Sequence, residues 1–266
     1  MPIWYYAVNP FLAAILTIIF VETLSLIGLF LARRFLLPRF HYSEGINDAV
    51  SGTVQAIGVF YGITVGLIAV GVWNTNSNAG DLVSKEASAI GGTYRDVSGL
   101  PAPRNRELCD KLREYTEFVV NQEWPAQRQG KIIDDGTTLI NDFQTKLFSF
   151  EPATAGQGNL HNESLRAFNV LTDSRRRRLD AVNSGLSGTM WSVIWVGAVF
   201  SIGVAYLFNI QDAKMHALLV GLMGGFLAIV LFMIAINDRP FYGKTSVTTD
   251  SYQLVLDRIH NAPVPK

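Results

Sequence analysis

Residues 54–73 read VQAIGVFYGITVGLIAVGVW, a run without a single formally charged side chain. About 20 mainly apolar residues in a helix span the hydrocarbon core of a bilayer, which is about 30 Å thick. Three further stretches, residues 10–31, 190–208 and 217–236, are similarly long and apolar. A soluble protein would have to bury all four as core helices, and their length and purity argue against that interpretation. The sequence therefore predicts four transmembrane helices.

The composition agrees with residence in a membrane. Hydrophobic residues make up 49% of the 266 residues and charged residues only 17%, which is too apolar for an ordinary soluble domain. Basic and acidic residues balance at 22 each, so no charge excess indicates a nucleic-acid partner. The single cysteine and the four histidines show no spacing typical of metal ligands. We expect no metal, no cofactor and no enzymatic activity.

Connection lengths group the four spans into two hairpins around a polar segment. We expect an N-terminal transmembrane hairpin in residues 1–73, a middle domain in 74–189, a C-terminal hairpin in 190–236 and an amphipathic tail in 237–266. Apolar residues of the middle domain recur every three or four positions, which is typical of helices. Two such apolar stripes are Val83, Ala87, Ile90, Tyr94, Val97 and Leu108, Leu112, Tyr115, Val119. We expect the helix that carries the second stripe to end at Trp124-Pro125. The predicted fold is an all-α integral membrane protein with a helical soluble domain between its hairpins.

Orientation follows from the basic residues near the membrane. Seven lie on the side of the middle domain and four on the side of the hairpin loops. The positive-inside rule then places the middle domain and both termini in the cytoplasm of a cell whose inner membrane holds the protein. Arg33 and Arg34, directly after the first span, argue for the opposite orientation.

Glycines mark one face of the second span. Gly58, Gly62 and Gly66 are spaced by four residues, so they lie on one helical face and allow another backbone to approach closely. This pattern serves equally for packing against a neighbouring span of the same subunit and for packing around a symmetric pore.

The opposite face of the same span is apolar. Ala56, Phe60, Thr64 and Leu67 lie on it, with one hydroxyl among them. Phenylalanines from several subunits could form a hydrophobic constriction that gates by dewetting. We interpret these four residues as candidate pore-lining residues.

Glu22 is the only formally charged residue inside the four spans. A charged carboxylate at the bilayer centre costs about 2.5–3.5 kcal/mol on insertion scales, so such a residue faces the bundle interior or a wet cavity. Two interpretations remain open. Glu22 lines an ion path with the second span, or it is a protonated acid that bonds to a neighbouring helix.

Residues 175–178 are four consecutive arginines shortly before the third span. A solvated helix face or contact with anionic lipid headgroups explains them, and so does a basic vestibule that attracts anions toward a pore. We expect all four, Arg175, Arg176, Arg177 and Arg178, to act as one basic surface.

Several short motifs occur in an order that resembles the bacterial bestrophin-like family over nearly the whole chain. They are Gly58-Val59-Phe60-Tyr61-Gly62, Lys85-Glu86-Ala87, Leu100-Pro101, Tyr115, Glu123-Trp124-Pro125 and Asn237-Asp238-Arg239-Pro240. Bestrophins proper are ring-shaped pentameric anion channels whose second helix lines the pore neck. The resemblance implies a homo-oligomer in a lipid bilayer, a permeant inorganic ion, and Phe60 as a neck residue with Ala56 one turn earlier. The sequence shows no acidic cluster typical of a calcium site, so calcium gating is not predicted.

Three functional hypotheses follow. The leading one is a homo-oligomeric ion channel whose second span lines a central pore, with an anion favoured by the resemblance. The alternative is a non-conducting membrane scaffold or sensor whose helical domain binds partners, and it predicts that the glycines of the second span pack within one subunit. A transporter fits less well, because the hairpins show no internal repeat and no broken helix.

Overall fold

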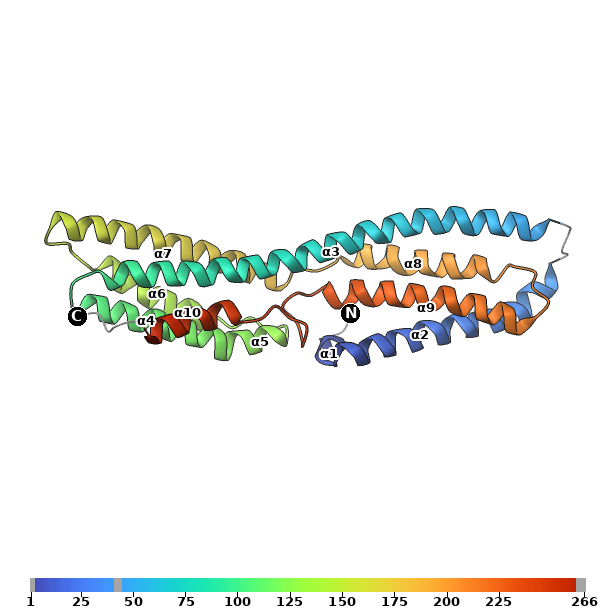
Figure 1. Ribbon diagram of the computed structural model, residues 1–266, viewed down its shortest axis with the longest axis horizontal. Helices are drawn as coiled ribbons and strands as arrows, with labels where there is room; N and C mark the ends of the chain where they lie inside the picture. The colour runs from blue at the N-terminus through green and yellow to red at the C-terminus, as the bar shows by residue number, and fades with distance from the viewer. Residues whose placement is uncertain (1–2, 41–44, 262–266) are drawn as a thin grey trace. The chain divides into compact units, whose positions relative to one another are not determined.

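The computed structural model describes residues 3–40 and 45–261, and every regular element within those ranges is a helix. Figure 1 labels the helices in chain order. They form two compact units, which we describe separately. The apolar unit comprises the chain up to Thr75 together with Gly185–Asp238. The polar unit comprises Asn76–Ser184 and the described residues from Arg239 onward.

Four long apolar helices build the apolar unit, and each is long and apolar enough to cross a membrane. The prediction of four such helices is confirmed. The helix α2 has the predicted bounds, and α8 and α9 differ from the predicted spans by four residues or fewer at each end. The elements are α1 (Ile3–Ala7), α2 (Pro10–Leu31), η1 (Ala32–Leu36), η2 (Leu37–Arg39), the first part of α3 (Ile46–Ser98), α8 (Gly188–Ala205) and α9 (Ala213–Asn237).

Side-chain caps fix where three of these helices begin. Asn9, Ser187 and Asp212 precede α2, α8 and α9, and a side-chain oxygen of each accepts a hydrogen bond from a backbone N–H of the first turn. Such caps satisfy donors that have no partner inside the helix. By contrast, α3 extends well beyond the predicted span end at Trp73, because no proline interrupts it before Ser98.

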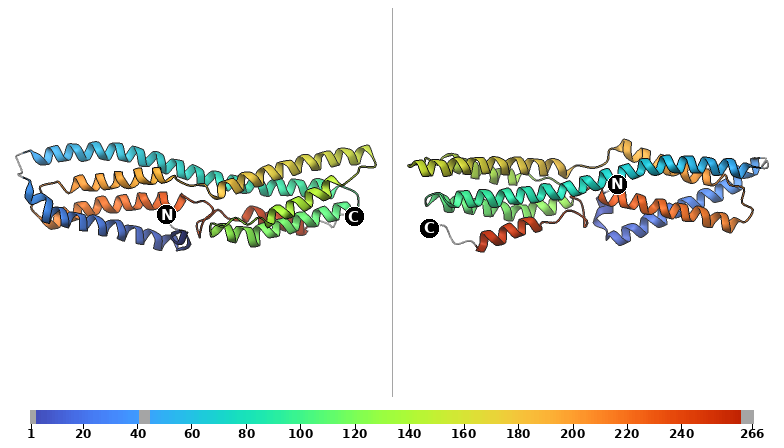
Figure 2. Two further views of the ribbon diagram at one scale, coloured as in Figure 1. Left: turned by 180° about the vertical axis from the view of Figure 1, so that it is seen from behind. Right: turned by 45° about the horizontal axis from the view of Figure 1, so that its top comes forward.

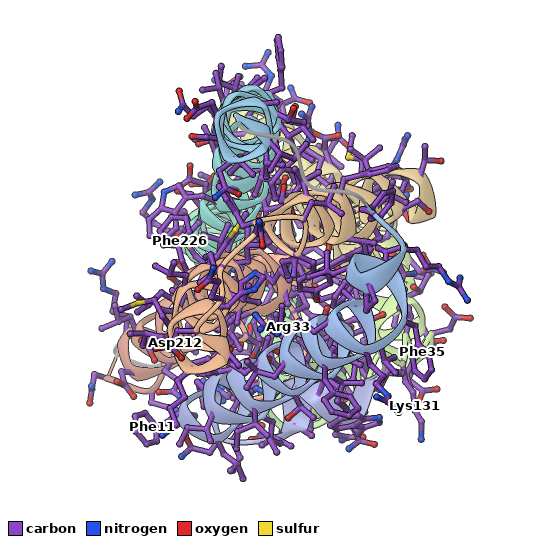
Figure 3. All side chains as sticks on the ribbon, turned by 90° about the vertical axis from the view of Figure 1, so that its right-hand side faces the viewer. Phe11, Arg33, Phe35, Lys131, Asp212 and Phe226 are labelled. Atoms are coloured by element: carbon purple, nitrogen blue, oxygen red, sulfur yellow. The ribbon has the colours of Figure 1, made fainter. Side chains whose placement is uncertain are left out.

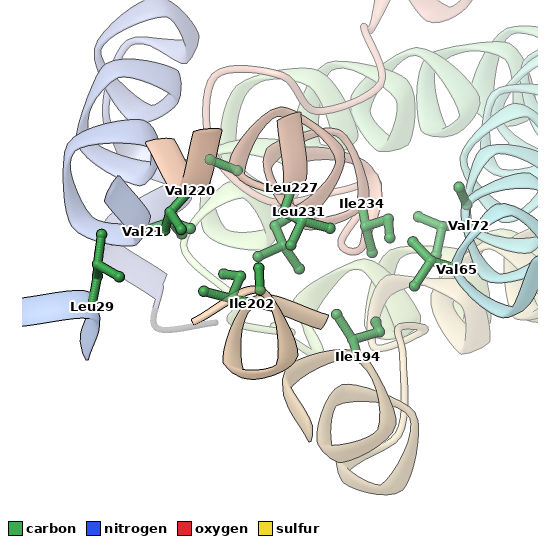
Figure 4. Packing of buried hydrophobic residues seen from close by; sticks show 13 residues of the cluster. Val21, Leu29, Val65, Val72, Ile194, Ile202, Val220, Leu227, Leu231 and Ile234 are labelled. Atoms are coloured by element: carbon green, nitrogen blue, oxygen red, sulfur yellow. The ribbon is translucent and has the colours of Figure 1, made fainter. Parts of the chain in front are cut away.

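The helices α2 and α3 lie on opposite sides of the apolar unit, with α8 and α9 between them (Figures 1 and 2). The most extensive packing is between α2 and α9. The connections predict that α2 pairs with α3 and α8 with α9. In the structure α8 packs on α9, whereas α2 packs mainly on α9 and lies across the unit from α3. Figure 4 shows the side chains that join the four helices. They are Val21, Leu29, Val65, Ala69, Val72, Ile194, Ile202, Ala205, Val220, Leu227, Ala228, Leu231 and Ile234.

The polar unit is a bundle around the remainder of α3. Both apolar stripes predicted for its first two helices are buried along their whole length. Burial of these stripes supplies the hydrophobic driving force that holds the helices together. The other elements are α4 (Arg104–Phe118), η3 (Val119–Glu123), α5 (Trp124–Arg128), α6 (Asp135–Phe148), α7 (Ala155–Val182) and α10 (Asp250–Asn261).

The prediction that a helix ends at Trp124-Pro125 is wrong. A π-helical turn, η3, leads from α4 directly into α5, so the chain stays helical as far as Arg128. Pro125 lies in the first turn of α5. Pro125 lies just after the π-helical turn, where the regular ladder of hydrogen bonds is already interrupted, so its missing N–H does not end the helix.

The helix of the amphipathic tail packs against other helices of the polar unit. Tyr252, Val255 and Ile259 form the buried side of α10, which packs against α4. The position that a Cβ would occupy on Gly91 of α3 lies 3.8 Å from a methyl group of Val255. The C-terminal helix is therefore part of this bundle.

A prediction follows from the contact of α3 with α8. The ring of Tyr61 lies directly against Gly197, where an added Cβ would overlap it. We expect Gly197→Ala to destabilise the apolar unit by about 1–3 kcal/mol through overpacking. The thermal denaturation midpoint in mild detergent measures this effect. The matched control is Gly203→Ala on the same helix, where no described residue approaches within 4 Å. Equal midpoints for the two variants would contradict the packing.

Candidate functional site

The membrane part of α3 contacts its own subunit along one side only. The hydroxyl of Tyr61 donates a hydrogen bond to the backbone oxygen of Ile194, with 2.9 Å between the oxygens. Val65 and Val72 lie on the same side and are only 3% and 5% exposed. The spacing of these residues, four and seven, describes a single helical stripe. The rest of the circumference of this segment is largely exposed among the described residues.

The glycine face belongs to this uncovered part. A Cβ added to Gly58, Gly62 or Gly66 would meet no described side chain or neighbouring helix within 4 Å. Glycine lowers helix stability by about 1 kcal/mol relative to alanine, so a stripe of glycines without a neighbour has a cost and no local benefit. Among the described residues, no helix packs against these glycines, so intramolecular packing, one of the two explanations that the sequence allowed, is not seen there.

The opposite face of α3 is also uncovered. Phe60 and Leu67 are 74% and 70% exposed, and Ala56 and Thr64 are exposed as well. The Thr64 hydroxyl donates to the backbone oxygen of Phe60 at 2.8 Å, so it is already satisfied by its own helix. The four predicted residues therefore present an apolar surface.

Glu22 lies elsewhere in the apolar unit. Its carboxyl group faces Gly221, Gly224 and Gly225 of α9. Since α8 and α9 separate α2 from α3 (Figure 1), the subunit does not bring Glu22 together with the Phe60 face. The structure thus splits the predicted pore-lining residues into one group on α3 and a separate acid between α2 and α9.

The four consecutive arginines do not form one basic surface, and that prediction is wrong for two of them. Arg175 and Arg178 are 5% and 0% exposed, whereas Arg176 and Arg177 are exposed. The physical reason is the helical period, which turns residues three apart to the same side. The two exposed arginines pair with acids on their own helix, Arg176 with Asp180 and Arg177 with Asp173.

The buried arginines bind two buried glutamates in the middle of the polar unit. Arg178 contacts Glu86 of α3 at 2.5 Å and Glu123 of η3 at 2.6 Å. Arg175 contacts Glu123 at 3.0 Å. Both glutamates are fully buried, so each charge has its counter-charge inside the core. Buried ions are tolerated when they are paired and hydrogen-bonded in this way.

Neutral polar groups complete the network. The Tyr115 hydroxyl donates to Glu86 at 2.5 Å and accepts from Arg175 at 2.8 Å. Gln127 accepts from Arg178 at 3.1 Å and donates to Glu123 at 3.0 Å. Burial and the neighbouring Glu86 carboxylate raise the pKa of Tyr115 well above its ordinary value, so the phenol stays protonated and remains a donor.

Sequence reasoning missed this network, although the sequence contains a signal for it. Glu86 lies three residues after Val83 and four before Ile90, so it falls on the predicted apolar stripe. Glu123 likewise lies four residues after Val119. An acid at a core position requires a buried partner. The two motifs that contain these acids are among those that carry the family resemblance.

A family model described as the bestrophin-like domain matches residues 19–252. The chain belongs to this family. The match covers most of the chain and confirms the resemblance found in the sequence. Comparison with curated proteins and with solved structures finds no match. Four long apolar helices and a bestrophin-like domain make the chain a membrane protein whose helices contact lipid.

The buried network of this bestrophin-like chain generates a second prediction. Arg178→Ala leaves two buried carboxylates short of a partner, and we expect a loss of about 3–5 kcal/mol in stability. Arg177→Ala, the matched control on the next residue, removes an exposed pair worth about 0.2–1 kcal/mol. The readout is resistance of the polar unit to proteolysis during a temperature ramp. Similar resistance of the two variants would show that the network is not essential to the bundle.

Proposed function

We propose that the chain forms a homo-oligomeric ion channel in which the membrane part of α3 lines a central pore. The observation that carries this proposal is the uncovered circumference of α3, with a glycine face on one side and an apolar face on the other. Membership of the bestrophin-like family supports it. The resemblance to bestrophins proper suggests a pentamer.

The glycine face is the proposed contact with a neighbouring subunit. Helices in a bilayer associate mainly through close van der Waals packing, and small residues spaced by four allow the backbones to approach. Gly58, Gly62 and Gly66 have that spacing and have no described neighbour within the subunit. A second copy of α3 would give this face the contact that the subunit does not supply.

The apolar face is the proposed pore wall. Phe60 is the largest of its four residues, and a ring of phenyl groups narrows a pore and excludes water until it widens. No free hydroxyl remains on this face, because the Thr64 hydroxyl is bonded to its own helix. We propose an inorganic ion as the permeant species, with an anion favoured by the family resemblance.

We also propose an inner-membrane location with the polar unit and both termini in the cytoplasm. The larger number of basic residues on the side of the middle domain supports this orientation.

The alternative function is a non-conducting scaffold or sensor. It predicts that the glycines of α3 pack within one subunit. That expectation disagrees with the uncovered face of α3, so the channel is the better-supported proposal.

Ion conduction tests the proposed function directly. The purified protein reconstituted into planar bilayers should carry current, and Phe60→Ala should change single-channel conductance several-fold by widening the constriction. The matched control is Phe226→Ala, because Phe226 is a similarly exposed phenylalanine, 68%, on α9. Absence of current from well-folded protein, or equal effects of the two substitutions, would contradict a pore lined by α3.

Oligomer stability tests the glycine face. We expect Gly62→Leu to raise the dissociation constant of the oligomer about tenfold or more, equivalent to about 1.4 kcal/mol. Gly203→Leu is the matched control, since Gly203 of α8 also has no described neighbour within 4 Å. Mass photometry in a lipid nanodisc or native mass spectrometry measures the populations. If both variants assemble equally well, lipid rather than a second copy covers the glycine face.

A further inference from the structure

The carboxyl group of Glu22 occupies a notch in α9 that exists because three residues there have no side chain. The position that a Cβ would take on Gly225 lies 2.7 Å from Oε1 of Glu22, so a side chain there would displace the carboxyl group. On Gly224 that position lies 3.4 Å from Oε2 and 3.0 Å from Oγ of Ser25. On Gly221 it lies 3.6 Å from Oε2. The glycine notch, Gly221, Gly224 and Gly225, thus makes room for a carboxyl group.

No counter-charge accompanies this carboxyl group. Among the described residues, no lysine, arginine or histidine forms an ion pair with Glu22. An unpaired carboxylate in the hydrocarbon region costs about 2.5–3.5 kcal/mol on insertion scales, and the neutral acid avoids that cost. The ligand whose chemistry fits the notch is a proton.

A run of polar groups leads from the notch toward the connection between α8 and α9. The Tyr206 hydroxyl donates to the backbone oxygen of Ser25 at 2.9 Å. His216 contacts the backbone oxygen of Ala205 through Nε2 at 3.1 Å. Arg33 lies 3.1 Å from Nδ1 of His216. Since arginine only donates, Nδ1 accepts, and the histidine proton is on Nε2.

Arg33 is the last group of this polar run and lies at the end of the helix bundle. It also donates to the backbone oxygen of Ile210 at 2.9 Å. Figure 3, which looks along the helices from that end, shows Arg33 between α2 and the beginning of α9, where Asp212 is labelled. The polar run therefore extends from this end of α2 to within one helical turn of Glu22.

We propose that Glu22 is a reversible proton-binding site within the membrane, next to the polar groups that lead toward the α8–α9 connection. The site does not depend on the proposed ion conduction, because α3 contributes nothing to it. Protonation leaves a neutral acid in the notch, and release of the proton leaves a carboxylate facing only glycines and Ser25. The ionisable groups that neighbouring elements bring to this side of α2 are Tyr5 of α1, Tyr206 after α8, His216 of α9 and Arg33 in η1.

Labelling with an apolar carbodiimide in lipid vesicles tests the proposal. A protonated carboxyl group transfers its proton to one carbodiimide nitrogen while its oxygen bonds to the central carbon, and rearrangement gives an N-acylurea that retains the whole reagent. Peptide mass spectrometry then locates the adduct. We expect adduct on Glu22, with a rate that falls about tenfold for each pH unit above the midpoint, as for a single proton. Glu22→Gln gives the background.

Glycine variants separate a specific notch from a carboxyl group that is merely accessible. Gly225→Ala, whose Cβ would overlap Oε1, should change the labelling rate about tenfold or more at fixed pH. Gly221→Ala is the matched control, because its Cβ would lie at an ordinary contact distance of 3.6 Å. Infrared difference spectroscopy of the carboxyl C=O stretch follows the same protonation without the reagent.

Two results would overturn the proposal. One is adduct on Glu22 at a rate that is the same from about pH 5 to about pH 9, the range of ordinary and desolvated carboxyl groups. The other is folded protein with neither adduct on Glu22 nor an infrared signal that Glu22→Gln removes. Both results are independent of whether the protein conducts ions, so they leave the proposed channel to its own test.

Discussion

The contact between Tyr61 and α8 determines how the membrane part of α3 is held. The ring lies on Gly197, and the hydroxyl bonds to the backbone oxygen of Ile194, so a bulky polar side chain is accommodated between two membrane helices. Because this contact and the adjacent valines lie on a single stripe, the other faces of the membrane part of α3 have no neighbour among the described residues. In water, such an exposed apolar surface would have to be buried. In a bilayer, it is covered either by lipid or by another helix. The proposed assembly rests on that choice.

The two units accommodate their glutamates inside the fold in different ways. In the polar unit, Glu86 and Glu123 are fully buried and are neutralised by Arg175 and Arg178. In the apolar unit, Glu22 faces glycines and has no ion pair among the described residues. The first arrangement keeps the glutamates and arginines charged, because removal of any partner would leave a buried ion without its counter-charge. The second leaves protonation as the way to neutralise the charge, and the proposed proton site rests on this difference.

Much of the fold was predictable because hydrophobic length and period are local properties of the chain. The bounds of α2 and the buried stripe from Val83 to Val97 are examples. The sequence did not show that α2 packs mainly on α9, because side-chain patterns identify a face without identifying its neighbour. It also misjudged the arginines at 175–178, because a run of like residues hides the helical period that turns Arg175 and Arg178 inward. For the candidate site, spacing located the glycine face of α3, but only the fold could show that the face is uncovered.

The proposed pore requires α3 to meet a second copy of the chain in the membrane. Electron cryo-microscopy of the full chain in a lipid nanodisc shows whether it does. We expect copies around a symmetry axis, with α3 of each copy nearest the axis and Gly58, Gly62 and Gly66 against the adjacent copy. A single subunit with acyl chains covering both faces of α3, or an assembly held only by other helices, would contradict it.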